Sequence, residues 1–173
     1  MEKETLKFIL DEQVDSISNP ELKELTYRII EKLPEGFWAR ESSKKYHPVD
    51  ERGECGNLIH SLKVEKLALR LLEPTHTNKE EIDLIKSASL LHDCMRHGPE
   101  GTAPFSVGNH PQLVREFIAC KGLTCELSDK VCDLIETHMG PWGHPPFFPE
   151  LSLNSVLQLA DYLAAQTDIS VEL

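Results

Sequence analysis

The hydrophobic and polar positions follow a helical pattern along nearly the whole chain. Apolar residues recur three and four positions apart, as they do on one face of an α-helix, and no segment gives a convincing strand pattern. Helices are therefore predicted at residues 4–12, 20–33, 56–72, 80–93, 109–121, 128–139 and 152–166. This pattern predicts one all-α domain built as a single helical bundle.

The segments between these helices are rich in Gly, Pro and Ser. Residues 34–56 and 98–109 are predicted to be long loops, and residues 143–150 a Pro-rich crossing. Loops as long as residues 34–56 are uncommon inside a compact domain and often carry function.

Turn and cap residues predict where two of the helices begin and end. Asn109 is expected to cap one helix, with Pro111 in its first turn. Ser128 is expected to cap the next helix, which should stop before the helix breaker Gly140-Pro141.

The composition is that of an ordinary globular protein, with 40% hydrophobic and 27% charged residues among 173 and a formal net charge of −11. This acidic balance makes nucleic acid an unlikely partner, because a nucleic-acid surface needs clustered Lys and Arg. The acidic first residues do not resemble a signal peptide, and no apolar run approaches the ~18–20 residues of a membrane span. The five cysteines include no CxxC pair and are expected to be reduced. We therefore expect a cytoplasmic protein with no membrane partner.

Several ligand-type side chains occupy positions where apolar residues would be expected. Burying a charge such as that of an aspartate costs free energy unless another group compensates it. Six residues lie on a buried helix face or at a helix end: His60, His92, Asp93, His110, His138 and Asp161.

Taken singly, each of these residues has an ordinary structural explanation. A lone histidine on an apolar face is more often a hydrogen-bonded core residue than a ligand, and Asp161 could cap a loop or pair with an arginine. Taken together, four imidazoles and two carboxylates could compensate one another around a divalent metal. This donor set suits Fe, Mn, Zn, Ni or Co, would also admit Mg, and needs no thiolate. Six ligands exceed what one tetrahedral ion takes, so two ions that share a carboxylate are expected.

The order of these residues resembles the signature of the HD-domain superfamily of metal-dependent phosphohydrolases, in its H…HD…H…H…D variant. The flanking sequences "LIHSLKV", "LLHDCMRHG", "NHPQLVREFI", "IETHMGPW" and "LADYLAAQ" fit as well, and the resemblance covers residues 37–166. It implies that residues 37–173 form the HD domain, with residues 1–36 as N-terminal helices packed on its core.

The resemblance also implies a role for each ligand. His60, His92, Asp93 and Asp161 would hold one metal ion, and Asp93 would bridge to a second. His110 and His138 would complete the second position.

The family pattern further implies catalytic roles for Asp93 and for Arg96. Many relatives carry a phosphate-contacting lysine where this chain has Arg96, whose forked guanidinium also suits phosphate oxygens. His97 follows, either as a proton donor or as a solvent-facing histidine. The implied reaction is hydrolysis of a phosphate ester or anhydride of a small nucleotide by metal-activated water.

Four further residues are candidates for contact with substrate. Tyr46 and His47 could line the entrance or merely pin the loop, and Lys63 lies one turn after His60. Trp142 could stack on a base or pack against the core. Two other functions stay open: a nuclease acting on single strands, and a non-catalytic module that senses nucleotides. The oligomeric state is also open.

Overall fold

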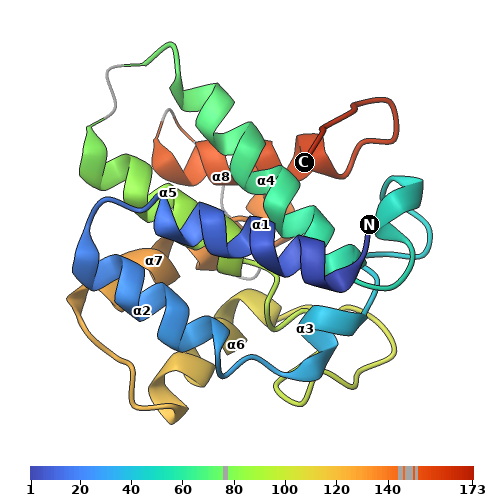
Figure 1. The fold of residues 1–173 in the computed structure, drawn as a ribbon, viewed down its shortest axis with the longest axis horizontal. Helices are drawn as coiled ribbons and strands as arrows, with labels where there is room; N and C mark the ends of the chain where they lie inside the picture. Colours follow the sequence, from blue (N-terminus) through green and yellow to red (C-terminus); the bar gives the residue numbers. More distant parts are fainter. Residues whose placement is uncertain (76–77, 144–145, 147–149, 151) are drawn as a thin grey trace.

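The structure is a computed structural model that describes residues 1–75, 78–143, 146, 150 and 152–173. Within these residues it contains helices and loops but no strand, so the all-α prediction is confirmed (Figure 1). The α-helices are α1 (Lys3–Asp15), α2 (Pro20–Ile30), α3 (Glu35–Ala39), α4 (Gly56–Leu72), α5 (Lys79–Leu91), α6 (His110–Cys120), α7 (Glu126–Glu136) and α8 (Leu153–Ala164). Two 3₁₀ helices, η1 (Val49–Glu51) and η2 (Gly140–Trp142), lie in the connections.

Helix α4 lies at the centre of the bundle. Thirteen of its 17 residues are buried, because α5 and α8 pack along it and α1 and α3 also contact it. A helix buried on most sides must also bury its polar residues, which then need partners inside the protein. No helix in the described part of the chain could cross a lipid bilayer. A cytoplasmic location stays a prediction.

The N-terminal helices share one hydrophobic core with α4 and α5. Leu6 and Leu10 of α1 are fully buried in it. The turn between α1 and α2 is bonded to α5, because the Asp83 carboxylate accepts from the Ser18 and Asn19 backbone N–H groups, each at 2.9 Å. The boundary proposed at residue 36 stays a prediction.

The caps differ in part from the predictions. Asn109 precedes α6 as predicted, but its side chain makes no capping hydrogen bond. Helix α7 begins two residues before Ser128, so the predicted cap is wrong. Cys125 is the N-cap residue instead, and Ser128 is the third residue of the helix. The Ser128 hydroxyl accepts a hydrogen bond from the Cys125 backbone N–H at 2.8 Å, as the N3 residue of a capping box does. The helix also ends at Glu136, earlier than predicted. Most of the crossing predicted at residues 143–150 lies outside the described residues.

The two long loops pack against each other. A Cβ atom on Gly36 would lie 2.2 Å from the carbonyl oxygen of Gly101, so only glycine permits this approach of the two backbones. Arg40 reaches the same loop and donates to the Thr102 carbonyl at 3.2 Å. Residues 34–56 are therefore more ordered than predicted, since α3 and η1 both lie within them.

Candidate metal centre

The structure brings the six predicted ligands together from five helices. α4 carries His60, the end of α5 is followed by His92 and Asp93, α6 begins with His110, His138 lies two residues after α7, and α8 carries Asp161. All four histidines and Asp93 are buried, and the Asp161 side chain is 22% exposed.

Asp93 lies at the middle of this group. Its Oδ1 is 2.9 Å from Nε2 of His110 and 3.7 Å from Nε2 of His138. Its Oδ2 is 3.8 Å from Nε2 of His92 and 3.9 Å from Nε2 of His60. Asp161 faces the same point from α8, with its Oδ1 2.9 Å from His60 Nε2 and 3.7 Å from His92 Nε2. Asp93 thus lies between the two pairs of histidines, with one carboxylate oxygen toward each pair.

Every imidazole presents its Nε2 atom to this centre because its Nδ1 atom is bonded elsewhere. Three of them donate Nδ1–H to the backbone carbonyl three residues earlier: His92 to Ser89, His110 to Val107 and His138 to Ile135, at 2.7–2.8 Å. His60 Nδ1 lies 3.0 Å from the Glu51 carboxylate. A carbonyl or carboxylate only accepts hydrogen bonds, so each Nδ1 carries a proton and each Nε2 atom faces the two carboxylates or the neighbouring imidazole.

Two buried atoms at the centre have no hydrogen-bond partner among the described residues, His92 Nε2 and Asp93 Oδ1. His110 Nε2 also faces His138 Nε2 at 3.3 Å, which sets two lone pairs against each other once both Nδ1 atoms carry protons. Buried polar atoms without partners are rare, and those in a native protein often mark an absent ion. The imidazole and carboxylate donors therefore fit a divalent metal.

The electrostatics suit metal binding at Asp93 and His138 but differ at His60. Burial alone would raise the pKa of Asp93, but the charge of the neighbouring Arg96 holds it well below its ordinary value. Burial lowers the pKa of His138 to about 3, so its imidazole is neutral at physiological pH. Burial opposes charge on His60 too, yet hydrogen bonds to Asp161 and Glu51 raise its pKa to about 9, so a metal ion at His60 Nε2 would have to replace a proton.

Comparison with known families agrees with this arrangement. A family model described as the HD domain matches residues 57–166, which is 110 of the 173 residues. The chain belongs to the HD-domain family. The HD domain so matched contains all six ligand-type residues, and its family consists typically of hydrolases. No curated protein and no solved structure matches the chain.

A cavity of about 770 Å³ opens onto the candidate metal centre of this HD domain. Asp93, His110, His138 and Asp161 line its floor together with Arg96, which donates to the Asp93 carboxylate. The predicted contacts His47, Tyr46 and Trp142 also line this cavity.

Two residues predicted to contact substrate lie outside the cavity lining. His97 is 5% exposed, and its ring nitrogens each lie 3.0 Å from a backbone carbonyl, those of Ala103 and Glu41. It joins the two long loops, so neither the solvent-facing position nor the proton donor fits. Lys63 is buried and donates to Asp50 and Glu51, at 2.9 Å and 2.8 Å. His97 and Lys63 therefore lie outside the lining of this cavity, and the substrate contacts predicted for them stay predictions.

Glu51, which is fully buried beside His60, was not among the residues predicted from the sequence. It lies within the charged run "VDERGE", which looks like a solvated loop. Its spacing of four residues from His47 was the available signal, since the two side chains are bonded at 2.8 Å. Tyr162, which follows Asp161 and lines the same cavity, was missed as well.

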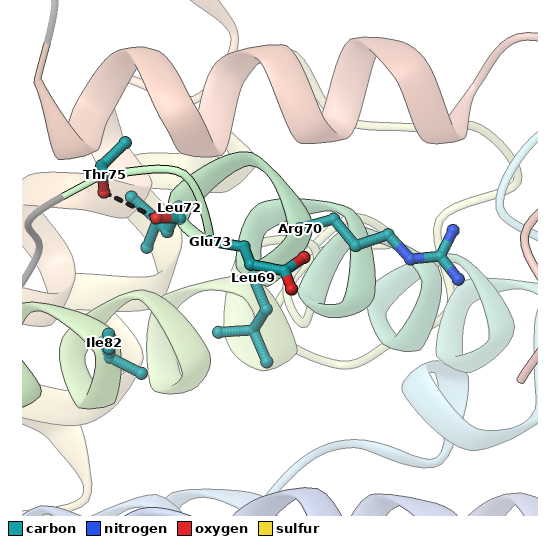
Figure 2. A pocket seen from close by; sticks show the side chains of 6 residues that line it. All are labelled: Leu69, Arg70, Leu72, Glu73, Thr75 and Ile82. Carbon is teal, nitrogen blue, oxygen red and sulfur yellow. Dashed lines mark hydrogen bonds between the residues drawn. The ribbon is translucent and has the colours of Figure 1, made fainter.

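A second groove lies at the other end of α4, lined by Leu69, Arg70, Leu72, Glu73, Thr75 and Ile82 (Figure 2). Leu69 is nine residues beyond His60, roughly 13 Å along the helix axis. Among the described residues of this lining, Glu73 alone has a side chain of metal-ligand type, and Thr75 donates to the Leu72 carbonyl at 2.6 Å. The ligand-type chemistry is therefore at the end of α4 that carries His60.

Proposed function

We propose that this HD-domain protein is a binuclear metal-dependent phosphohydrolase that acts on a small nucleotide. The observation that carries the proposal is the set of four imidazoles whose Nε2 atoms surround two carboxylates, with His92 Nε2 and Asp93 Oδ1 buried and unpartnered among the described residues. Such a set has a clear chemical purpose around divalent ions and costs stability without them.

One metal position would be held by His60, His92, Asp161 and Asp93. Asp93 would be shared with a second position completed by His110 and His138. The donor atoms suit Fe, Mn, Zn, Ni or Co, and Mg is a weaker fit because it prefers oxygen ligands. When bound, divalent ions lower the pKa of water from about 15.7 toward about 7 and neutralise charge on phosphoryl oxygens.

Arg96 supplies the positive charge of the protein itself at the cavity. Its side chain is 14% exposed, it is bonded to Asp93, and its buried Nε has no partner among the described residues. A guanidinium placed this way can turn part of its fork to a phosphoryl oxygen while its neighbour Asp93 serves as a ligand. Arg96 would thereby bind and orient the phosphoryl group and stabilise charge that develops on it.

The cavity wall favours a substrate with a planar group. Tyr46, Trp142 and Tyr162 line it and remain 71%, 70% and 48% exposed. Aromatic faces left open beside a phosphate-binding centre can stack on a nucleobase. A volume of about 770 Å³ is also within the range of ~300–1,000 Å³ typical of small-molecule sites.

Metal analysis followed by a substrate screen tests the proposal. The purified protein should contain close to two transition-metal ions per chain and release phosphate from nucleoside phosphates or cleave small dinucleotides. Cleavage of single-stranded RNA or DNA alone would favour the nuclease. Metal-loaded protein that binds nucleotides without turnover would favour the sensing module, and protein free of metal after loading would contradict the metal centre.

A further inference from the structure

Glu51 is the hub of a buried hydrogen-bond network behind the proposed centre. Its side chain is fully buried, and its Oε2 atom accepts from Nδ1 of His60 at 3.0 Å and from Nδ1 of His47 at 2.8 Å. Its Oε1 atom accepts from the Lys63 ammonium at 2.8 Å. Burial opposes the charged carboxylate, but these donors hold the pKa of Glu51 below its ordinary value. His47, Glu51 and His60 are close enough to hold an ion, yet the Lys63 ammonium already occupies the carboxylate. The group is therefore a hydrogen-bond network.

His60 needs such a partner because of where it lies. His92 and His138 follow the C-terminal ends of α5 and α7, where their Nδ1–H groups reach backbone carbonyls of the last turn. His110 begins α6, and its Nδ1–H reaches the Val107 carbonyl in the preceding loop. His60 lies inside α4, where the carbonyls accept the N–H groups of the helix itself. A side chain from another element must therefore take its Nδ1–H, and Glu51 does so.

The backbone around Glu51 fixes the carboxylate in place. The Glu51 carbonyl accepts from the Ser42 N–H at 3.0 Å. A Cβ atom on Gly56 would lie 2.0 Å from the same carbonyl oxygen, so η1 is pressed directly against the start of α4. The carboxylate thus reaches His60 from a loop that also supplies Tyr46 and His47 to the cavity wall.

We propose that Glu51 is a positioning residue that orients His60 and strengthens the metal position to which His60 belongs; this inference rests on the proposed function. An anionic acceptor makes the imidazole a stronger ligand than a neutral carbonyl does. The position of His60 and Asp161 therefore has a carboxylate behind one histidine and a carboxylate of its own. The position of His110 and His138 has only backbone carbonyls behind it and the shared Asp93. The two positions are unequal, and the first fills at lower metal concentration.

Zinc titration of Glu51→Gln, with a competing chelator, tests this role. The variant keeps the shape of the side chain and loses its charge. The dissociation constant of the tighter zinc ion should rise about 10–100-fold, the range found when a partner behind a metal ligand is replaced. The weaker zinc ion should change by less than about threefold, because its histidines are bonded to carbonyls. Glu65→Gln is the matched control, since Glu65 is also fully buried but its carboxylate has no hydrogen-bond partner among the described residues, the proposed ligands included. Both zinc affinities should be unchanged in this variant.

Nitrogen-15 NMR of the zinc-loaded protein gives a second readout. The His60 Nδ1 proton, bonded to a carboxylate, should resonate downfield of those of His92, His110 and His138 and move toward them in Glu51→Gln. Unchanged zinc affinities and an unmoved resonance would overturn the role of Glu51. If Glu51→Gln loses its helical circular dichroism, the nitrogen-15 NMR spectrum of the wild-type protein provides the test. A wild-type His60 resonance that falls among those of the other three histidines would overturn the role of Glu51. Wild-type protein that binds no zinc would instead overturn the proposed function.

Discussion

Two fully buried glutamates, one in η1 beside α4 and one on α4 itself, show how differently this fold treats buried charge. Glu51, in η1, has two imidazoles and an ammonium within hydrogen-bond distance, and its pKa is lowered. Glu65, on α4, has no hydrogen-bond partner for either carboxylate oxygen among the described residues, and burial raises its pKa to about 7. The region around Glu51 therefore retains a buried anion, whereas the region around Glu65 favours the protonated acid.

The difference separates a region organised for ligands from one organised for packing. Around Glu51, every charge faces an opposite charge or a hydrogen-bond donor, and the network ends at the proposed metal ligands. Around Glu65, the nearest cations are Lys66 and Lys86, which lower its pKa less than burial raises it. Substitutions in the first region should change metal content and activity, and those in the second should change stability alone.

The largest effect is expected for Asp93→Ala. This change removes the carboxylate proposed to be shared by both ions, so metal content should fall and hydrolysis should drop more than about 100-fold, beyond the ~10–100-fold typical of a residue behind a ligand. Phosphate release and elemental analysis of the same preparation measure both effects. Wild-type activity in the variant would refute the mechanism.

A smaller and more selective loss is expected for His110→Ala and His138→Ala. Each variant should lose about one metal ion per chain and keep the other, because these histidines belong to the second position. Activity should fall sharply while circular dichroism stays helical, since both side chains lie at helix ends. Asp161→Ala should lose the opposite ion. The mononuclear arrangement is correct if wild type and both histidine variants all hold the same single metal.

A milder effect is expected at the cavity mouth for Trp142→Ala. Base stacking on an aromatic ring is worth about 1–3 kcal/mol, so KM for a nucleotide should rise about 5–150-fold with little change in kcat. A phosphate ester without an aromatic group should be hydrolysed as by wild type. Phe105→Ala is the control, because Phe105 is 75% exposed and is absent from the lining of the cavity. Equal losses for both esters would argue against stacking.

No change in activity, but a change in stability, is expected for Glu65→Met. The folded pKa of about 7 lies above the ordinary value of 4.5, so the folded protein binds this proton more tightly than the unfolded chain. The contribution of Glu65 to the free energy of unfolding is therefore most favourable below about pH 4.5 and declines as the pH rises to about 7. The variant should be more stable than wild type at pH 8, by roughly 3 kcal/mol at most, and gain little at pH 4. Urea unfolding at the two pH values measures this, and an equal gain at both would rule out the carboxyl as its source.

The sequence predicted the helices and the six ligand-type residues for the same physical reason. A polar residue on an apolar helical face is visible in the periodicity, and His60, Asp93 and Asp161 each stood out in this way. The helix ends were less predictable. Ser128 has the chemistry of a cap but serves as the third residue of the capping box, a difference of position that composition does not reveal.

Glu51 and the course of its loop could not be predicted in this way. Residues 34–56 have no periodic pattern, and their path depends on close backbone contacts such as that of Gly36 with Gly101. Lys63 and His97 lie close in sequence to the proposed ligands and were therefore predicted to contact substrate. In the structure, each is bonded to the loop of residues 34–56, Lys63 to Glu51 and His97 to the Glu41 carbonyl. Side chains whose roles depend on loop geometry therefore require the structure.

Helix η1 lies before residues 57–166, the part of the chain that matches the HD-domain model, so a transfer of the matched residues alone would leave η1 behind. A fragment starting at Asn57 would contain all six ligand-type residues and the whole matched region. It would lack Glu51, leaving His60 Nδ1 without this acceptor, and it would lack α1 and α3, which also contact α4. The segment recognisable across the family is thus smaller than the unit that can evolve as one piece, and the preceding loop must be exchanged together with it.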